Sequence, residues 1–262
     1  VLSGSRGSGT IFFGNCNLRC CYCQNHQISQ NRERQKANET DCHTLVRHML
    51  HLQDDLGCHN INFVSPSHFV PQIVKALLEA IPMGLRLPLV YNTNGYDSIK
   101  TLKELGGIID IYLPDLKYAS DNRARKYSRA RAYVLHSRNA IREMYRQVGE
   151  LVVDEKGVAR RGLIVRHLIL PNGLAGSRES LVWLAREVSP KVTVSLMSQY
   201  HPMHRASQFP LLARPISLSE YEDTLRVMEE VGLEAGWAQD MGAQKLYLPD
   251  FECEGHPHPF KL

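Results

Sequence analysis

The chain is predicted to be an α/β protein built on a parallel sheet. Short apolar runs alternate with segments whose apolar residues recur at helical spacing. Repeated β–α units of this kind form parallel strands joined by right-handed crossovers. In addition, polar residues follow the ends of the apolar runs, as they do where strands of an α/β sheet present residues to an active face. Six strands can form an open doubly wound sheet or a partial barrel, and the periodicity alone does not decide between them.

Each predicted strand is a short apolar run that ends at a polar or turn segment. The third run ends at Thr93-Asn94-Gly95 and the fifth at Pro171-Asn172-Gly173, both typical turn sequences. The predicted strands are Thr10–Asn15, Ile61–Ser65, Leu89–Asn92, Ile108–Leu113, Leu163–Leu170 and Val192–Met197.

The predicted helices lie between these strands and end at recognised stop signals. Leu45, Met49 and Leu52 share one helical face, and glycines follow the third and sixth helices. The predicted helices are Asp41–Asp54, Val70–Ala80, Asp97–Leu105, Ala132–Gln147, Arg178–Glu187 and Ser219–Val231, the last with Ser219 as its N-cap.

Composition limits the class of protein. With 262 residues and 43% apolar residues, the chain can form one large domain, 1–262. Because the first residue is Val1, we expect the N-terminus to be trimmed, and 253–262 to be a loose tail. A net charge of +4 permits an acidic partner without indicating nucleic acid. No apolar run is long enough for a membrane span and no signal peptide is evident, so with seven scattered or clustered cysteines a reducing cytoplasmic location is expected.

Four cysteines lie within eight residues, directly after the first strand. The useful spacing is Cys16-x3-Cys20-x2-Cys23, with Cys21 as an extra thiol whose side chain should diverge from that of Cys20. Three thiolates on one loop can hold three irons of a [4Fe–4S] cluster and leave the fourth iron open. The alternatives are a zinc site completed by His26 or Cys42, as in an interaction module, and an electron-transfer cluster with Cys42 as fourth ligand.

The stretch "CNLRCCYC" resembles the radical SAM superfamily signature CxxxCxΦC, with Tyr22 at the aromatic position. The stretches "INFVSPSHFVPQI", "VYNTNGY", "LPDLKY" and "MSQYHPMHRA" resemble the branch akin to pyruvate formate-lyase activating enzymes. The resemblance implies a partial (β/α)6 barrel that binds a [4Fe–4S] cluster and S-adenosyl-L-methionine (SAM). It further implies an oxidoreductase that cleaves SAM reductively to a 5′-deoxyadenosyl radical, which then abstracts hydrogen from a substrate.

The resemblance also assigns residues to the two cofactors. It makes Cys16, Cys20 and Cys23 the cluster ligands, and it places Lys117 and Arg166 near the SAM carboxylate. The full set of expected SAM contacts is Tyr22, Asn92, Asp115, Lys117, Arg166 and His201. The chain departs from the family pattern after the second strand, where Ser65-Pro66-Ser67-His68 replaces a GGE-like motif. The SAM amine would then be met there by backbone carbonyls or by the two serines.

The hydrogen donor and the reductant are predicted only by class. The branch resemblance favours a backbone glycine of a glycyl-radical enzyme, and a peptide or small metabolite is the alternative. A run of eight basic residues is either a solvated helix face or a docking surface for an acidic flavodoxin or ferredoxin-type reductant. These residues are Arg123, Arg125, Lys126, Arg129, Arg131, Arg138, Arg142 and Arg146.

Overall fold

The computed structural model describes residues 1–242 and 249–251 and shows one sheet whose main path is entirely parallel. The strand order is β1-β2-β3-β4-β6-β7-β8, and the short β5 pairs antiparallel with β6. The seven strands of the main path therefore lie side by side in the order in which they occur in the sequence. This is the arrangement of a barrel that has not closed. The strands are β1 Gly9–Phe12, β2 Ile61–Val64, β3 Leu89–Thr93, β4 Ile111–Pro114, β5 Val152–Val153, β6 Ala159–Leu168, β7 Thr193–Met197 and β8 Gly236–Ala238.

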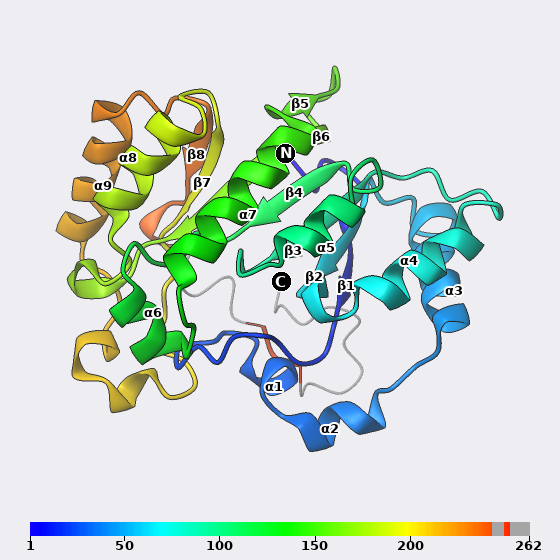
Figure 1. Cartoon of the computed structure of the whole chain (residues 1–262), viewed down its shortest axis with the longest axis horizontal. Coiled ribbons are helices and arrows are strands. Elements are labelled where there is room, and N and C mark those ends of the chain that lie inside the picture. The colour runs from blue at the N-terminus through cyan, green and yellow to red at the C-terminus, as the bar shows by residue number, and fades with distance from the viewer. Residues whose placement is uncertain (243–248, 252–262) are drawn as a thin grey trace.

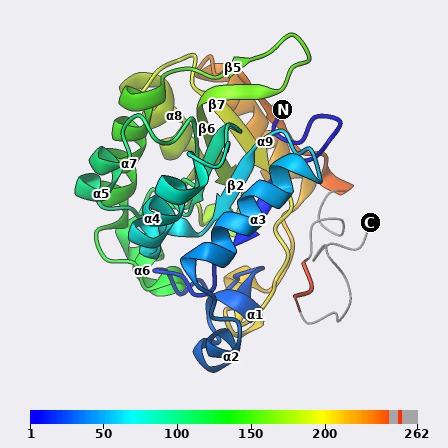
Figure 2. The same ribbon diagram turned by 90° about the vertical axis from the view of Figure 1, so that its right-hand side faces the viewer.

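The helices pack on the outside of the sheet in the same order as the strands. In Figure 1, α3 and α4 cover one end, α8 and α9 the other, and α5 and α7 lie between. Figure 2 shows the same layering from the side. The helices are α1 His26–Ser29, α2 Arg32–Ala37, α3 Cys42–Asp54, α4 Val70–Ala80, α5 Ile99–Glu104, α6 Asp121–Ser128, α7 Tyr133–Val148, α8 Ser177–Glu187 and α9 Leu218–Glu230. No helix in the described part of the chain is long and apolar enough to cross a membrane.

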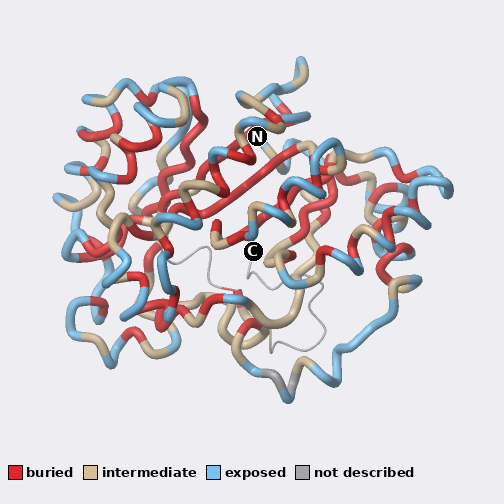
Figure 3. Tube along the Cα trace, in the orientation of Figure 1, coloured by how far each residue is buried: buried red, intermediate tan, exposed pale blue. Residues whose placement is uncertain are grey.

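The two faces of the sheet have different cores. Most buried side chains lie between the outer face and the helices, and Figure 3 shows the strands as the most continuously buried part of the chain. A small second cluster, which includes Val90, Ile111 and Ile164, fills one part of the inner face. Side chains alternate between faces along a strand, so Asp115 shares the inner face with Ile111 and Leu113. The polar site lies at this end of the inner face.

The predicted fold class is confirmed, and the six predicted strands and six predicted helices all form. One cap was wrong: the N-cap of α9 is Ser217, whose hydroxyl accepts from the amide of Glu220 while the Glu220 carboxylate accepts from the Ser217 amide. A reciprocal pair of this kind satisfies two amides that the helix leaves free. The prediction missed α1, α2, α6, β5 and β8. The predicted tail, 253–262, lies outside the described residues.

Candidate active site

The cysteine loop follows β1, and side chains from the loop itself and from the segment around α1 hold its backbone. Arg19 Nη1 donates to the carbonyl of Cys16 (2.7 Å), and Gln30 Nε2 donates to that of Cys20 (2.9 Å). His26 Nδ1 lies 3.2 Å from the carbonyl of Cys23. Arg19 of the loop and two residues of the segment containing α1 therefore fix the backbone at the three cysteines of the motif.

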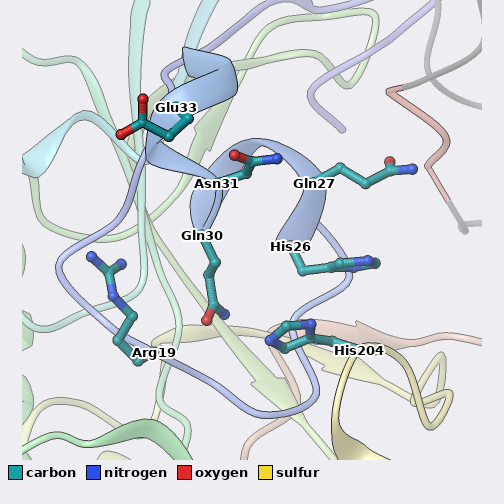
Figure 4. A pocket seen from close by; sticks show the side chains of 7 residues that line it. All are labelled: Arg19, His26, Gln27, Gln30, Asn31, Glu33 and His204. Carbon is teal, nitrogen blue, oxygen red and sulfur yellow. The ribbon is translucent and has the colours of Figure 1, made fainter. Parts of the chain in front are cut away.

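The side chains of Arg19, His26 and Gln30 also line an outer cavity of about 590 Å³, which Figure 4 shows. Its polar groups are largely engaged within the protein: the rings of His26 and His204 stack with centroids 4.9 Å apart, and Gln27 binds Asp250. Its residues are Arg19, His26, Gln27, Gln30, Asn31, Glu33 and His204. This cavity contains none of the predicted cofactor residues, so we assign it to support of the cysteine loop.

Three thiols of the motif act electrostatically on one another, and other groups set the pKa of the fourth. Cys16, Cys23 and the ammonium of Lys117 all act electrostatically on Cys20, whose pKa burial raises to about 12. Burial likewise raises the pKa of Cys23. Cys21 is instead influenced by Arg205, and burial raises its pKa to about 11. The side chain of Cys21 thus diverges from the group, as expected for a neighbour of Cys20.

The donor set fits an iron–sulfur cluster better than a single metal ion. Within residues 1–242 and 249–251, no three Cys, His, Asp or Glu side chains converge as ligands of one metal ion would. The candidates for a fourth zinc ligand are engaged elsewhere, since His26 faces a carbonyl and the Cys42 thiol lies 3.9 Å from the Gln72 carbonyl. In a cubane cluster each thiolate binds a different iron, so three thiols need only surround it.

Each of the three thiols also meets a polar side chain that the sequence did not single out as a partner. Asn94 Nδ2 donates to Cys16 Sγ (3.3 Å), and Ser128 Oγ donates to Cys20 Sγ (3.0 Å). Ser29 Oγ lies 3.2 Å from Cys23 Sγ. Asn94 follows a predicted strand and was interpreted as a turn residue, so its position was a usable signal. Ser128 and Ser29 gave none, because a lone serine in a polar stretch is usually exposed.

The inner cavity brings most of the predicted residues together. It has a volume of about 170 Å³ and lies beside the cysteine loop at the carboxyl ends of the strands. Its lining includes Cys20, Cys23, Tyr22, Asp115, Lys117, Arg166 and His201, together with Gln24, Asn25, Leu168, Met197, Gln199 and Tyr200. Two expected residues, Cys16 and Asn92, are not part of this lining.

Asp115, Lys117 and Arg166 form a charge cluster on the cavity wall, in which Asp115 is buried and the two cations are partly buried. Asp115 and Arg166 bridge neighbouring strands, and Arg166 Nη2 lies 2.7 Å from Asp115 Oδ1. Lys117 Nζ lies 2.5 Å from Asp115 Oδ2. Although burial opposes ionisation, the two cations hold the pKa of Asp115 below its ordinary value. Two cations and one carboxylate leave a net charge of +1 on this wall.

Two polar atoms in this cluster, one donor and one acceptor, lack a hydrogen-bond partner among the described residues, which fits a zwitterionic ligand group such as the amino-acid part of SAM. Arg166 Nε is buried without a hydrogen-bond partner in the described part of the chain. Asp115 Oδ1 has the close ion pair with Arg166, but the contact lacks the alignment of a hydrogen bond. Buried polar groups normally have partners. Lys117 and Arg166 would therefore hold the SAM carboxylate, and the thiols beside them would hold the cluster.

The remaining predicted residues are placed as follows. The Tyr22 side chain is buried, and its hydroxyl donates to that of Tyr118 (2.7 Å), so the ring packs beneath the cluster loop. Asn92 is buried on β3 and is in register with Leu113 of β4. Leu113 precedes Asp115 by two residues and lies on the same face of the sheet. His167 faces the outer core, where its Nδ1 lies 2.7 Å from the Leu116 carbonyl, and burial lowers its pKa to about 4. Ser67, a candidate for the SAM amine, donates to Asp97 instead (2.6 Å).

An open parallel barrel with three cysteines beside a charged cavity defines an enzyme class, and a family comparison agrees. The model of the radical SAM superfamily matches residues 10–154, and the chain belongs to this superfamily. Its members use a [4Fe–4S] cluster and SAM. This membership excludes the zinc interaction module as the main interpretation.

Individual relatives are more distant. An uncharacterised protein of Methanocaldococcus jannaschii, MJ0674, is 28% identical over 233 residues, which cover 87% of this chain and 63% of that protein. Among solved structures, the chain resembles the FeFe-hydrogenase maturase HydG from Carboxydothermus hydrogenoformans (TM-score 0.55, 11% identity) and Streptococcus suis SuiB (0.56, 12%). Both alignments cover 88% of this chain but only 52% and 49% of the other. At these identities the likeness is one of fold.

Proposed function

We propose that this radical SAM protein binds a [4Fe–4S] cluster through Cys16, Cys20 and Cys23 and binds SAM in the inner cavity. Reductive cleavage of SAM would then supply a 5′-deoxyadenosyl radical that takes hydrogen from a substrate. The observation that carries the proposal is the shared cavity: Cys20 and Cys23 line the same space as the charge cluster with its net positive charge. SAM bound at the cluster's open iron would thus lie beside groups suited to its carboxylate.

The chain's own residues would bind and orient SAM. Lys117 and Arg166 would neutralise the carboxylate, and Asp115 fixes both cations through its ion pairs. His201, which also lines the cavity, would contact ribose or adenine. The backbone near Tyr22 would meet the adenine edge, because the Tyr22 hydroxyl is already bound to Tyr118. Asn92 would contact SAM from a position nearer the sheet. Because Ser67 donates to Asp97, Ser65 and nearby backbone carbonyls are left to bind the SAM amine.

Anaerobic reconstitution with iron and sulfide, followed by SAM and dithionite, tests the proposal. We expect about four irons per chain and formation of 5′-deoxyadenosine by the wild type. Cys20→Ala should lose both the cluster and the product. Cys21→Ala is the matched control, because its thiol is buried in the same loop but directed elsewhere, and it should retain both. Full activity in Cys20→Ala, or a colourless wild-type protein, would refute the proposal.

The hydrogen donor is proposed to be a backbone glycine of a glycyl-radical enzyme. The support is the resemblance of several motif stretches to activating enzymes, together with a sheet whose end strands, β1 and β8, do not pair with each other in the described residues. Incubation of the reduced, SAM-loaded protein with candidate glycyl-radical enzymes should produce the EPR doublet of a glycyl radical. Formation of deoxyadenosine without a doublet, when a peptide or small metabolite is added, would favour the alternative substrates.

The reductant is proposed to be an acidic flavodoxin or ferredoxin-type protein. Half of the basic run is internally engaged: Arg142 pairs with Glu187 and Arg146 with Glu143, for example. The other half is exposed and forms no ion pair in the described part of the chain: Arg125, Lys126, Arg129 and Arg131. These cations flank Ser128, whose hydroxyl touches Cys20. Reversing the charge of two of these four residues should slow reduction of the cluster by flavodoxin, especially at low salt. Reduction of the cluster by dithionite should stay unchanged.

A further inference from the structure

A buried chain of hydroxyl groups ends on the sulfur of Cys20. Tyr22 OH donates to Tyr118 OH (2.7 Å), Tyr118 OH lies 2.7 Å from Ser128 Oγ, and Ser128 Oγ donates to Cys20 Sγ (3.0 Å). All three side chains are buried, and Tyr118 and Ser128 are fully inaccessible. This series of hydroxyl groups thus connects Tyr22, at the aromatic position of the cysteine motif, to Cys20 through two residues from outside the motif.

The directions of these hydrogen bonds follow from proton counting. Each hydroxyl has a single proton to donate. Because Ser128 gives its proton to sulfur, Tyr118 must donate to Ser128, and Tyr22 then donates to Tyr118. All three dipoles therefore point toward Cys20. Hydrogen bonds in such a series polarise one another, and the effect is strongest in a buried, low-dielectric setting.

Backbone hydrogen bonds hold Ser128 in place independently of this series of hydroxyl groups. Ser128 is the last residue of α6, and Arg129 ends the helix in a left-handed conformation. The carbonyl of Ser128 accepts from the Arg19 amide (3.0 Å), and that of Tyr127 accepts from the Cys21 amide (2.8 Å). These two bonds join the end of α6 to the cysteine loop. The hydroxyl of Ser128 is therefore delivered to the sulfur by the fold itself.

We propose that Ser128, oriented by Tyr118 and Tyr22, raises the reduction potential of the cluster held by Cys20. The inference depends on the proposed function only in that a cluster is bound. Reduction adds negative charge to the cluster and its sulfurs, so a hydrogen bond to a ligand sulfur stabilises the reduced form more than the oxidised form. Ser128 is thus a positioning residue that makes electron uptake from a biological reductant easier.

The test is an EPR-monitored redox titration of reconstituted protein. Ser128→Ala should lower the equilibrium constant for reduction about tenfold, equivalent to a shift of ~59 mV for a one-electron couple. Tyr118→Phe and Tyr22→Phe should produce successively smaller shifts in the same direction, and Ser128→Thr, which keeps a hydroxyl, should restore part of the wild-type potential. Ser137→Ala is the matched control, because it removes another fully buried serine hydroxyl, one that contacts the Val134 carbonyl, and it should have no effect.

A second measurement keeps the proposal testable if one variant loads poorly. Pulsed EPR of the reduced wild-type cluster after exchange into deuterated buffer should detect an exchangeable hydrogen near the cluster that is absent in Ser128→Ala and weakened in Tyr118→Phe. Equal potentials in wild type, Ser128→Ala and Tyr118→Phe would overturn the proposal, even if deoxyadenosine forms normally. Conversely, a shifted potential in a protein that never cleaves SAM would support the proposal while refuting the proposed function.

Discussion

Two buried carboxylates near the ends of neighbouring strands have opposite electrostatic surroundings. Asp115, after β4, meets two cations, which hold its pKa below the ordinary value. Asp97, after β3, meets the hydroxyls of Ser67, Tyr91 and Thr93, and burial raises its pKa. The three hydroxyl groups around Asp97 complete a closed structural network. The cations of Asp115 exceed its charge and leave unfilled atoms, so only this carboxylate is arranged around a place for a ligand.

The largest expected effect of breaking this difference comes from Asp115→Asn. The change leaves the partly buried ammonium of Lys117 and guanidinium of Arg166 without a counterion, and removal of one partner of a buried pair costs up to about 3–5 kcal/mol. Urea denaturation should therefore show a large loss in the free energy of unfolding. A loss below about 1 kcal/mol would show that these charges are solvated and that no buried cluster exists.

A smaller effect, measured on SAM binding, is expected for Lys117→Met. Loss of the proposed charged hydrogen bond to the SAM carboxylate would cost about 1.5–3 kcal/mol, or roughly a 10- to 150-fold weaker SAM affinity. Calorimetry with cluster-loaded protein measures it. Lys126→Met is the control, because Lys126 is an exposed lysine over the Tyr127 ring, and its SAM affinity should match the wild type. Equal affinities for both variants would remove Lys117 from the site.

Ser67→Ala distinguishes a structural role from a cofactor role for the segment that replaces the GGE-like motif. We expect the free energy of unfolding to fall by about 1–2 kcal/mol, since Asp97 loses its 2.6 Å donor. The affinity for SAM should stay unchanged. A marked loss of SAM affinity with normal stability would instead place the Ser67 hydroxyl on the SAM amine.

The smallest effect concerns pH. Because the folded-state pKa of Asp97 is raised, its contribution to stability is full below its unfolded pKa, near 3.8, and falls as pH rises through the folded value. Asp115 has the opposite sign: its contribution is present above about 3.8 and falls as pH decreases through the lowered value. Relative to wild type, Asp97→Asn should therefore gain stability as pH rises from about 3 to 6. The same pH trend in wild type and Asp97→Asn would contradict the raised pKa.

Much of this site could be anticipated because strand ends are visible in a sequence. Cys16, Asp115 and Arg166 follow or lie within apolar runs, and parallel pairing brings such positions to one edge. Three further contacts, Asn94, Ser128 and Tyr118, were not anticipated as site residues. Helix α6, which carries Ser128, has a strongly polar sequence that was interpreted only as a basic run. Its role depends on docking against the cysteine loop, a long-range contact with no local signature.

The sequence by itself determined the order of strands and helices, the cysteine spacing and the superfamily, because these depend on local periodicity and on fixed separations along the chain. Tertiary structure decided which partner each polar group has. Adjacent residues Arg166 and His167 show this: strand alternation predicts opposite faces, but only the packed sheet places the first against Asp115 and the second against the Leu116 carbonyl. The physical reason is that charge and burial energies depend on neighbours in space, and those neighbours come from distant parts of the chain.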